Sequence, residues 1–167
     1  MPPINYCTRS DLPEVLAIIN DSAKAYEGII PADRWHDPYM TAAELDREVQ
    51  TGVEFHAWGG DRRIEGVMGI QDVGDVALIR HAYVRTTMRG KGIGRELLHH
   101  LVALTHKPVL IGTWRAAQWA ITFYERQGFL LFDDVTKDKL LRKYWKVPDR
   151  QIQASVVLGN RTLEYSP

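Results

Sequence analysis

Apolar side chains recur along the chain at two spacings, and stretches of the two kinds alternate. Some repeat every three or four positions, as on an amphipathic helix, and others alternate or run on over strand length. The first pattern predicts helices over residues 10–26, 41–52, 93–104, 116–128 and 136–145. The second predicts strands over residues 4–9, 53–60, 61–73, 76–85, 109–114, 129–134 and 151–159. Residues 27–40 hold two prolines and no steady period, which favours a loop with short helical pieces.

Capping and turn residues mark several element boundaries. Ser10 suits the N-cap of the first helix. Thr41 and Glu44 have the spacing of a capping box at the start of the second. Turn signals at 59–61 and 74–75 separate three consecutive strands, which therefore predict an antiparallel meander.

The order of the predicted elements implies a mixed sheet. The strand–helix–strand units of the second half imply parallel pairing, whereas the meander implies antiparallel pairing. We therefore expect an α/β fold with helices on the faces of a mixed central sheet. No repeat, low-complexity tract or linker interrupts the pattern, so residues 1–167 are predicted to form one domain.

Composition favours a packed globular protein and argues against several other classes. Hydrophobic residues make up 45% of the 167 residues and charged residues 25%. Lys and Arg number 21, as do Asp and Glu, whereas a nucleic-acid-binding surface usually brings a basic excess. No apolar run approaches the roughly 18 residues of a membrane span. Cys7 is the one cysteine, which fits a reducing compartment, so a cytoplasmic protein is expected.

Three glycines at alternate positions, Gly90, Gly92 and Gly94, stand where the third predicted helix begins. Glycine loses the most backbone freedom on folding, so this spacing needs a reason. Helix N-termini bind anions through unsatisfied N–H groups, and glycines let that backbone approach a ligand closely. Five basic residues and no acidic residue lie between positions 76 and 95. These features predict a phosphate-bearing ligand.

Two common phosphate-binding patterns do not fit this segment. The P-loop pattern fails because Arg85 stands at its first glycine position and Gly92 follows Lys91. The dinucleotide pattern fails because, counted from Gly92, its third glycine position is Leu97, and because the chain lacks the early strand–helix–strand context of that pattern.

Two motifs resemble those of one enzyme family. Residues 89–94 (RGKGIG) resemble the R/Q-x-x-G-x-G/A motif of the GNAT superfamily of acyl-CoA-dependent N-acyltransferases. Residues 120–129 (AITFYERQGF) resemble the family's helix that carries Phe-Tyr-Glu and ends in Gly-Phe. The element order also agrees, so the resemblance covers nearly the whole chain. It implies a mostly antiparallel sheet with a parallel, splayed middle pair. It also implies an N-acetyltransferase that moves an acetyl group from acetyl-CoA, its cosubstrate, to a primary amine by direct attack in a ternary complex.

The resemblance further implies a site for the donor. The pyrophosphate of coenzyme A would be held by the backbone amides of Arg89, Gly90, Lys91, Gly92, Ile93, Gly94 and Arg95. The pantetheine arm would pair with the backbone of Ala82, Tyr83 and Val84, and an N–H near Val84 would face the thioester oxygen. An asparagine of many members is Ala117 here, so one side-chain contact is missing or is replaced by Gln118.

Tyr124 and His81 are the candidate catalytic residues. An alkyl amine has a pKa of about 10.4, so a base or a water chain must deprotonate it, and an acid can protonate the leaving thiolate. By resemblance Tyr124 is that acid, although helical spacing alone also fits a core tyrosine. His81 has a suitable pKa for the base. Strand alternation places it on one face with Ala77, Ile79 and Tyr83, where it could instead be a buried core histidine.

Other residues are weaker candidates for this chemistry. Glu65, Asp72 and His36 are further options for the base, and ordered water can replace a side chain. Cys7 is better explained as a small buried residue than as an acyl carrier, because no basic helix start lies beside it to lower its pKa. Direct transfer is therefore expected.

The acceptor side is less defined. By resemblance it is bordered by the first helices, their loop and the loops near the last strands. Residues 28–40 offer aspartates and aromatic residues that could hold a cationic amine, although anchoring of the loop to the core fits equally well. Trp114, Trp119 and Trp145 fit either a cavity wall or packing. The expected partner is a small-molecule or peptide amine, with no nucleic acid and no membrane, and a homodimer stays open.

Three alternatives to a metal-free acetyltransferase are weighed against the sequence. A non-catalytic acyl-CoA-binding regulatory module would keep the glycine loop without an acid near the sulfur, and Tyr124 argues against it. The failed P-loop pattern disfavours phosphoryl transfer. His99, His100 and His106 lack the spacing of a metal motif, so no metal ion is expected.

Overall fold

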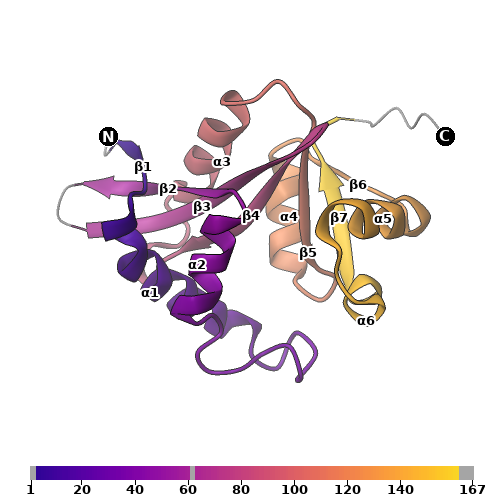
Figure 1. The fold of residues 1–167 in the computed structure, drawn as a ribbon, viewed down its shortest axis with the longest axis horizontal. Helices are drawn as coiled ribbons and strands as arrows, with labels where there is room; N and C mark the ends of the chain where they lie inside the picture. The colour runs from indigo at the N-terminus through magenta and orange to yellow at the C-terminus, as the bar shows by residue number, and fades with distance from the viewer. Residues whose placement is uncertain (1–2, 61–62, 162–167) are drawn as a thin grey trace.

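The computed structural model describes residues 3–60 and 63–161, and a seven-stranded sheet runs through its centre (Figure 1). The strand order across the sheet is β1-β2-β3-β4-β5-β7-β6. The strands are β1 (Ile4–Tyr6), β2 (Val53–Gly60), β3 (Arg63–Val73), β4 (Val76–Val84), β5 (Val109–Trp114), β6 (Leu130–Leu131) and β7 (Ser155–Gly159). Neighbouring strands are antiparallel except for β4 and β5. The predicted mixed, mostly antiparallel sheet is confirmed.

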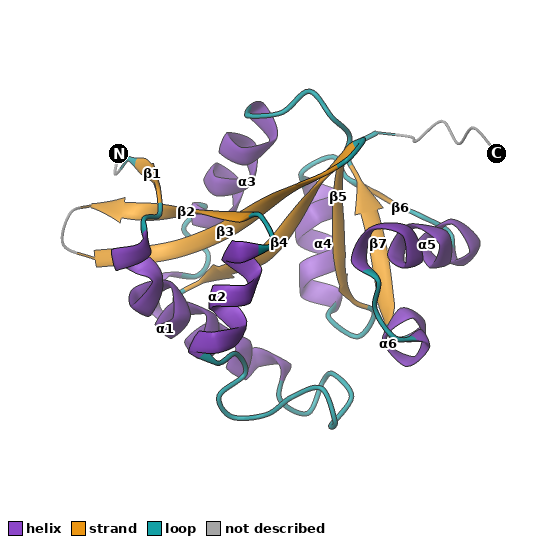
Figure 2. Cartoon of the chain, in the orientation of Figure 1, coloured by secondary structure: helices purple, strands orange, loops and turns teal. Residues whose placement is uncertain are grey.

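Helices cover both faces of the sheet (Figure 2). They are α1 (Leu12–Ser22), α2 (Ala42–Gln50), α3 (Ile93–Ala103), α4 (Gln118–Arg126), α5 (Asp134–Leu140) and α6 (Asp149–Gln153). Apolar residues of α3 and α4 form one core with one face of the sheet. On the opposite face, α1 and α2 cover the N-terminal half and α5 and α6 cover the C-terminal half. The site lies between these two halves, as described below.

The parallel pair β4–β5 is short. Its register joins Ala77 to Val109 and ends where Ile79 meets Ile111. Beyond that point β4 continues beside β3, and β5 continues beside β7. The carboxyl ends of β4 and β5 therefore separate, which is the splay expected for the middle pair.

A β-bulge interrupts β4 close to this separation. The step from Val67 to Gly69 on β3 is matched by a longer step from Tyr83 to Arg80 on β4. The extra residue lies in β4, where His81 adopts a φ of 57°. A bulge of this kind bends its strand and re-aims the side chains that follow.

Because of the bulge, four β4 side chains do not all point to the one face of the sheet that was predicted for them. Ala77 and Ile79 belong to the core beneath α3, whereas Tyr83 belongs to the core beneath α1 and α2. His81 faces Glu48 of α2. The expectation that the four share one face is wrong, because one additional residue shifts the alternation of every position after it.

The chain after α4 differs from the predicted pattern. The strand predicted over 129–134 shrinks to two residues, because the Asp133 side chain accepts a hydrogen bond from the Thr136 N–H and caps α5. The helix predicted over 136–145 continues from α5 as a π-helical turn, Leu141–Trp145. A short-range cap therefore outweighs the apolar run that favoured a longer strand.

The last predicted strand is also shorter than expected. Residues 151–153 of the predicted strand 151–159 belong to α6 instead, whose N-cap residue is Pro148. The strand itself starts at Ser155. Proline suits a helix start because it has no N–H to leave unsatisfied there.

The segment between α1 and α2 is largely irregular, as predicted, but it is anchored. The Trp35 Nε1–H donates a hydrogen bond to the Ala23 carbonyl over 3.0 Å. The Asn20 side chain exchanges two hydrogen bonds with the backbone of Met40. The loop is thereby held against the end of α1.

Local boundary signals have mixed outcomes. The capping box begun by Thr41 is confirmed. Ser10 lies within a 3-10 turn, and the N-cap residue of α1 is Asp11. The turn predicted over 59–61 reaches residue 61, which lies outside the described residues. In residues 3–60 and 63–161, no helix has the length and apolar content that a membrane crossing needs.

Candidate active site

A cleft of about 1130 Å³ opens where β4 and β5 separate. Its walls come from the end of β4, the glycine loop, β5, α4 and the 3-10 turn that follows α1. The predicted site residues that line it are His81, Ala82, Tyr83, Val84, Arg89, Gly90, Lys91, Gly92, Ile93, Gly94, Arg95 and Tyr124. The fold therefore brings both sequence motifs to one cavity, whose volume suits a large ligand.

The glycine loop presents bare backbone to the cleft. Gly90 and Gly92 have φ values of 78° and 83°, which residues with side chains rarely adopt. Gly92 is the N-cap residue of α3, and no side chain caps this helix. The N–H groups of its first turn are therefore available to an anion. This geometry fits a pyrophosphate group.

Gly94 has a separate reason to be small. A Cβ at this position would lie 3.4 Å from the ring of Phe123. The missing side chain lets the first turn of α3 approach α4 closely. The loop and Tyr124 thereby come to lie on adjoining walls of the cleft.

Tertiary contacts reduce the positive charge that the sequence concentrates before α3. Arg85 lies 3.1 Å from Glu14 and 3.6 Å from Glu65. It also donates a hydrogen bond to the carbonyl of Ile64. Arg85 therefore serves to join α1, β3 and β4, and its charge is compensated within the fold.

The basic residues of the loop itself differ in their contacts. The Arg89 guanidinium donates to the carbonyl and hydroxyl of Ser22, each over 3.3 Å. Lys91 and Arg95 form no ion pair within the described part of the chain, and both line the cleft. These two side chains remain available to a phosphate, whereas Arg89 also ties the loop to α1.

Tyr124 lies in the cleft wall on α4, between the rings of Phe123 and Phe129. Its side chain is buried, with 7% exposed. Burial, with a smaller contribution from Tyr26, raises the pKa of its phenol well above the ordinary value of 10. The hydroxyl therefore keeps its proton at neutral pH and can act as a hydrogen-bond donor.

The position at which the family resemblance lacks an asparagine is fully buried. Ala117 has no exposed surface and precedes α4. The neighbouring Gln118 lines the cleft, and its amide donates to the carbonyl of Arg115 over 3.0 Å. Gln118 thus lies at the cavity, with one of its polar groups already bonded to the backbone.

His81 lies at the bulge of β4 and lines the cleft. Its Nε2 is 3.4 Å from Oε2 of Glu48. Burial by itself raises the pKa of Glu48, but the facing His81, with Arg80 and Arg47, holds that pKa below the ordinary 4.5. Sequence reasoning missed Glu48, because no local pattern connects it with a strand more than thirty residues later.

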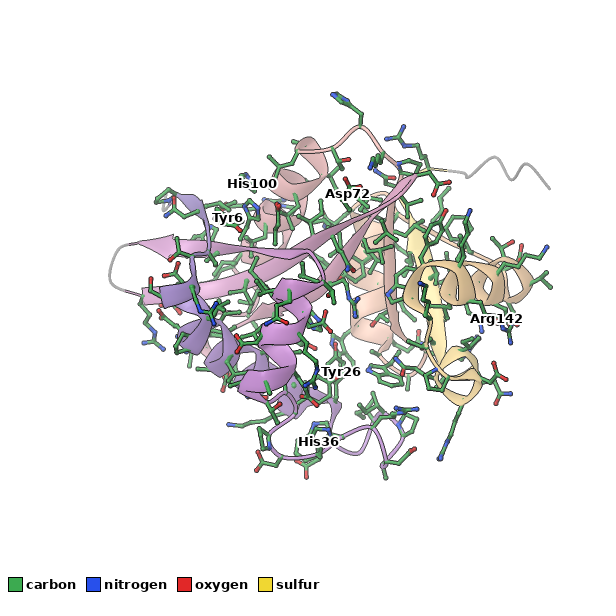
Figure 3. All side chains as sticks on the ribbon, viewed as in Figure 1. Tyr6, Tyr26, His36, Asp72, His100 and Arg142 are labelled. Carbon is green, nitrogen blue, oxygen red and sulfur yellow. The ribbon has the colours of Figure 1, made fainter. Side chains whose placement is uncertain are left out.

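The weaker candidates for a base lie elsewhere. Glu65, Asp72 and His36 do not line the cleft. In Figure 3, Asp72 is labelled in the upper part of the molecule and Tyr26, which lines the cleft, in the lower part. The His36 ring is bonded to the carbonyl of Pro38 in its own loop. His81 is therefore the one of the predicted base candidates that the fold brings to the cavity.

Aromatic side chains line the part of the cleft away from the glycine loop. The Tyr26 ring centroid lies 5.9 Å from that of Tyr39, 6.3 Å from that of Tyr83 and 5.7 Å from that of Trp119. Tyr26 and Trp119 come from opposite walls of the cleft: Tyr26 lies in the turn after α1, and Trp119 lies on α4. Burial raises the pKa of Tyr26 to about 12, so it also stays protonated.

Two more aromatic residues complete this region, which we call the acceptor half of the cleft. It is lined by Tyr26, Tyr39, Trp114, Trp119 and Trp145. Trp145 packs flat against β5, where a Cβ on Gly112 would lie 3.1 Å from its ring. The three tryptophans predicted as either cavity wall or packing thus line the cavity, while sequence reasoning missed Tyr26.

Acidic side chains are missing from this lining. No aspartate or glutamate is among the described residues that form the cleft wall. Of residues 28–40, Tyr39 reaches the cleft, whereas Asp33 pairs with Arg150 of α6 over 3.0 Å. The aspartates of this loop therefore do not provide the cationic contact that its composition suggested.

Cys7 is remote from this chemistry. It is buried near α2 in a separate small cavity. Burial, with Asp11 and Glu14, raises the pKa of its thiol from 9.0 to about 12. A protonated thiol outside the cleft cannot serve as the nucleophile of an acyl-enzyme step.

We expect native Cys7 to resist alkylation. A pKa near 12 in place of 9.0 leaves about a thousandfold less thiolate at any pH below 9. Iodoacetamide labelling followed by mass spectrometry should therefore be at least that much slower in native protein than in urea. Equal rates under the two conditions would contradict the buried, protonated thiol.

Comparison with known proteins agrees with this geometry. Residues 51–130 match the family model of the acetyltransferase (GNAT) domain. The peptidyl-lysine N-acetyltransferase YiaC of Escherichia coli is 26% identical over 144 residues, which are 85% of this chain and 92% of that protein.

Solved structures share the fold. The PaiA N-acetyltransferase of Thermoplasma acidophilum, in complex with coenzyme A, has a TM-score of 0.69 at 15% identity and covers 97% of this chain and 99% of its own. A GNAT-family acetyltransferase of Staphylococcus aureus also has a TM-score of 0.69, at 18% identity, with 96% and 100% covered. The splayed sheet, the uncapped glycine loop and these matches agree: residues 51–130 match the GNAT acetyltransferase domain, the chain shares the fold of solved GNAT acetyltransferases, and together the matches support a GNAT N-acetyltransferase.

Proposed function

We propose that this acyltransferase moves the acetyl group of acetyl-CoA to the ε-amine of a lysine side chain in a peptide or protein, by direct attack in a ternary complex. One observation carries the proposal. A single cleft joins an anion-binding loop, a buried protonated tyrosine and an aromatic, acid-free acceptor half.

The donor half of the cleft is suited to coenzyme A. The amides of residues 89–95 and the side chains of Lys91 and Arg95 would hold the pyrophosphate. The β4–β5 pairing ends at Ile79, so the backbone of residues 82–84 keeps a free edge toward the cleft. An extended pantetheine arm can pair with such an edge as an added strand.

Chemistry at the thioester follows from the same walls. The bound cosubstrate supplies an activated acyl carbon. The N–H near Val84 would donate to the carbonyl oxygen as negative charge develops there. Tyr124 would donate its proton toward the departing sulfur, which leaves as a thiol. Cys7 lies outside the cleft, which supports direct transfer without an acyl-enzyme step.

The lining of the acceptor half supports a lysine side chain as the acceptor. No carboxylate is among the described residues that line the cleft. A polyamine or an aminoglycoside, which carries several positive charges, therefore finds no acidic side chain there to pair with. A lysine brings one positive charge, on an alkyl stem that packs on aromatic rings. The similarity to a peptidyl-lysine N-acetyltransferase supports the same class.

The proposal also covers the domain organisation and the cellular location of the protein. One domain over residues 1–167 is supported by a sheet to which both ends of the described chain add strands. A cytoplasmic location is supported by the single, unpaired cysteine.

Free thiol release tests the proposed reaction. Purified protein is mixed with acetyl-CoA and peptides with blocked N-termini that contain one lysine, and the same peptides with arginine serve as matched controls. We expect thiol release and one acetyl group on the lysine peptide, none on the arginine peptide, and weaker turnover of spermidine and kanamycin. Tight acetyl-CoA binding without thiol release for any lysine peptide would overturn the proposal.

A further inference from the structure

Glu48 and His81 form a partly buried pair at the edge of the cleft. Glu48 lies on α2 and His81 at the β4 bulge, and their Oε2 and Nε2 atoms are 3.4 Å apart. The two side chains are 23% and 16% exposed. His81 also packs against the ring of Phe55, with the ring centroids 6.0 Å apart. The imidazole is therefore held on one side by a carboxylate and on another by an aromatic ring.

The two facing atoms have no hydrogen-bond partner. Oε2 of Glu48 and Nε2 of His81 are both buried, and in the described part of the chain neither forms a hydrogen bond, either with the other across 3.4 Å or elsewhere. A buried polar atom without a partner costs about 1–3 kcal/mol, so natural folds seldom keep one without a use. The other oxygen of Glu48 lies 3.6 Å from Arg80, which keeps the carboxylate ionised beside the ring.

The backbone conformation at His81 places its side chain in this pair. A φ of 57° is uncommon for residues other than glycine, although asparagine, aspartate and histidine adopt it more often than other residues do. Without the bulge, the alternation of β4 would place residue 81 with Ala77 and Ile79 in the core beneath α3. Strained residues of this kind gather at functional sites. Here the bulge turns an imidazole toward both the cleft and α2.

We propose that Glu48 is a positioning residue that keeps the proton of neutral His81 on Nε2, so that Nδ1 receives a proton from the acceptor ammonium. This inference rests on the proposed function. In the step, one N–H bond of R–NH₃⁺ breaks and an Nδ1–H bond forms, which gives R–NH₂ and an imidazolium beside the Glu48 carboxylate. The amine then forms a C–N bond with the acyl carbon and the C–S bond breaks. The sulfur leaves as a thiol with the proton of Tyr124, Tyr124 regains a proton from the second N–H of the former amine, and His81 releases its own proton to solvent.

The charges around the pair agree with this role. Glu48 faces His81 from α2, where Arg47 is also close enough to influence Glu48. Arg80 approaches from β4, and its guanidinium is shared between Glu48 and Gln71. The net effect on the ring is that of a carboxylate partly offset by an arginine. A neighbouring carboxylate stabilises imidazolium, so it helps His81 accept the proton.

Nuclear magnetic resonance tests the pair without any substrate. Two-bond ¹H–¹⁵N spectra report the tautomer and titration of each of the six histidines, and His81→Gln identifies the relevant signals. We expect His81 to hold its neutral proton on Nε2. We expect the preference for Nε2 to be lost in Glu48→Gln, whose neutral ring should divide between the two tautomers. The matched control is Asp46→Asn, which removes one negative charge from the same helix away from His81 and should leave the tautomer unchanged. The same tautomer in wild type and Glu48→Gln would overturn the pairing.

Kinetics test the catalytic part of the inference. In wild type, kcat/KM for a lysine peptide should fall at low pH with the midpoint that His81 shows by resonance. Glu48→Gln should alter this limb and lower kcat at pH 7 about tenfold. His81→Gln should abolish the limb. Acetyl-CoA affinity, measured by calorimetry, should stay within about twofold in both variants, which shows that they fold.

The outcomes separate this inference from the proposed function. An active wild type whose pH limb is unchanged in Glu48→Gln overturns the role of the pair and leaves the acetyltransferase assignment intact. A wild type that acetylates no lysine peptide overturns the proposed function, and the catalytic role of the pair falls with it, whatever the resonance titration shows.

Discussion

Replacement of Tyr124 by phenylalanine is expected to lower kcat about a hundredfold, with acetyl-CoA affinity nearly unchanged. General acid catalysis contributes about 10²–10⁴-fold, and only the hydroxyl is removed. The ring of Tyr124 would keep its contacts with Phe123 and Phe129, so the wall of the cleft is preserved. The loss should therefore fall on turnover and spare binding.

Steady-state kinetics with a lysine peptide at saturating acetyl-CoA measure this effect. Tyr6→Phe is a matched control, because Tyr6 lies on β1 with 57% of its surface exposed and does not line the cleft. The same loss of one hydroxyl should leave kcat unchanged there. A Tyr124→Phe enzyme with the turnover number of wild type would exclude the acid role.

Leu101→Ala is expected to lower the free energy of unfolding by about 3 kcal/mol. Leu101 of α3 is fully buried in the core between this helix and the sheet. Removal of three carbon atoms from such a site loses transfer free energy and leaves a cavity, which together cost about 2–5 kcal/mol. Leu101 does not line the cleft, so the effect should appear in stability rather than in the site.

Leu104→Ala, near the same end of α3, is the control variant for Leu101→Ala. Helical spacing groups both leucines on one apolar side, but Leu104 is the C-cap residue of α3 and 56% exposed. Its truncation should change stability by less than about 0.5 kcal/mol. Urea unfolding followed by circular dichroism compares the two variants. Equal losses in the two would contradict the burial described for α3.

Helices and strands with a strong apolar period and clear capping or turn residues could be predicted from the sequence. Elements in which these signals are weak could not. The meander and α2 follow from alternation, turn residues and the capping box of Thr41. The predicted strand 151–159 failed in its first residues because an apolar run of this length fits either a helix or a strand. Pro148 at the N-cap and the burial of Ile152, a residue of α6, in the adjoining core decided for a helix there.

The glycine loop was more predictable from the sequence than the rest of the cleft. Its glycines and its helix are adjacent in sequence, so one short segment holds the whole structural requirement. The pair of Glu48 and His81 involves two elements and an inserted residue, and Tyr26 comes from a turn that looks like the end of a helix. Such contacts depend on how elements pack, which spacing along one element does not report.

By itself the sequence determined the class of sheet, the glycine-rich start of α3 and the resemblance to one acetyltransferase family. These depend on local periods and on residues close together in the chain, where backbone sterics and helix geometry act directly. Only the tertiary structure decided which side of β4 each residue faces and which charges of the basic segment are compensated. The physical reason is that one bulge reverses the alternation of β4, and that Glu14, Glu48 and Glu65 reach their cations only when distant elements pack.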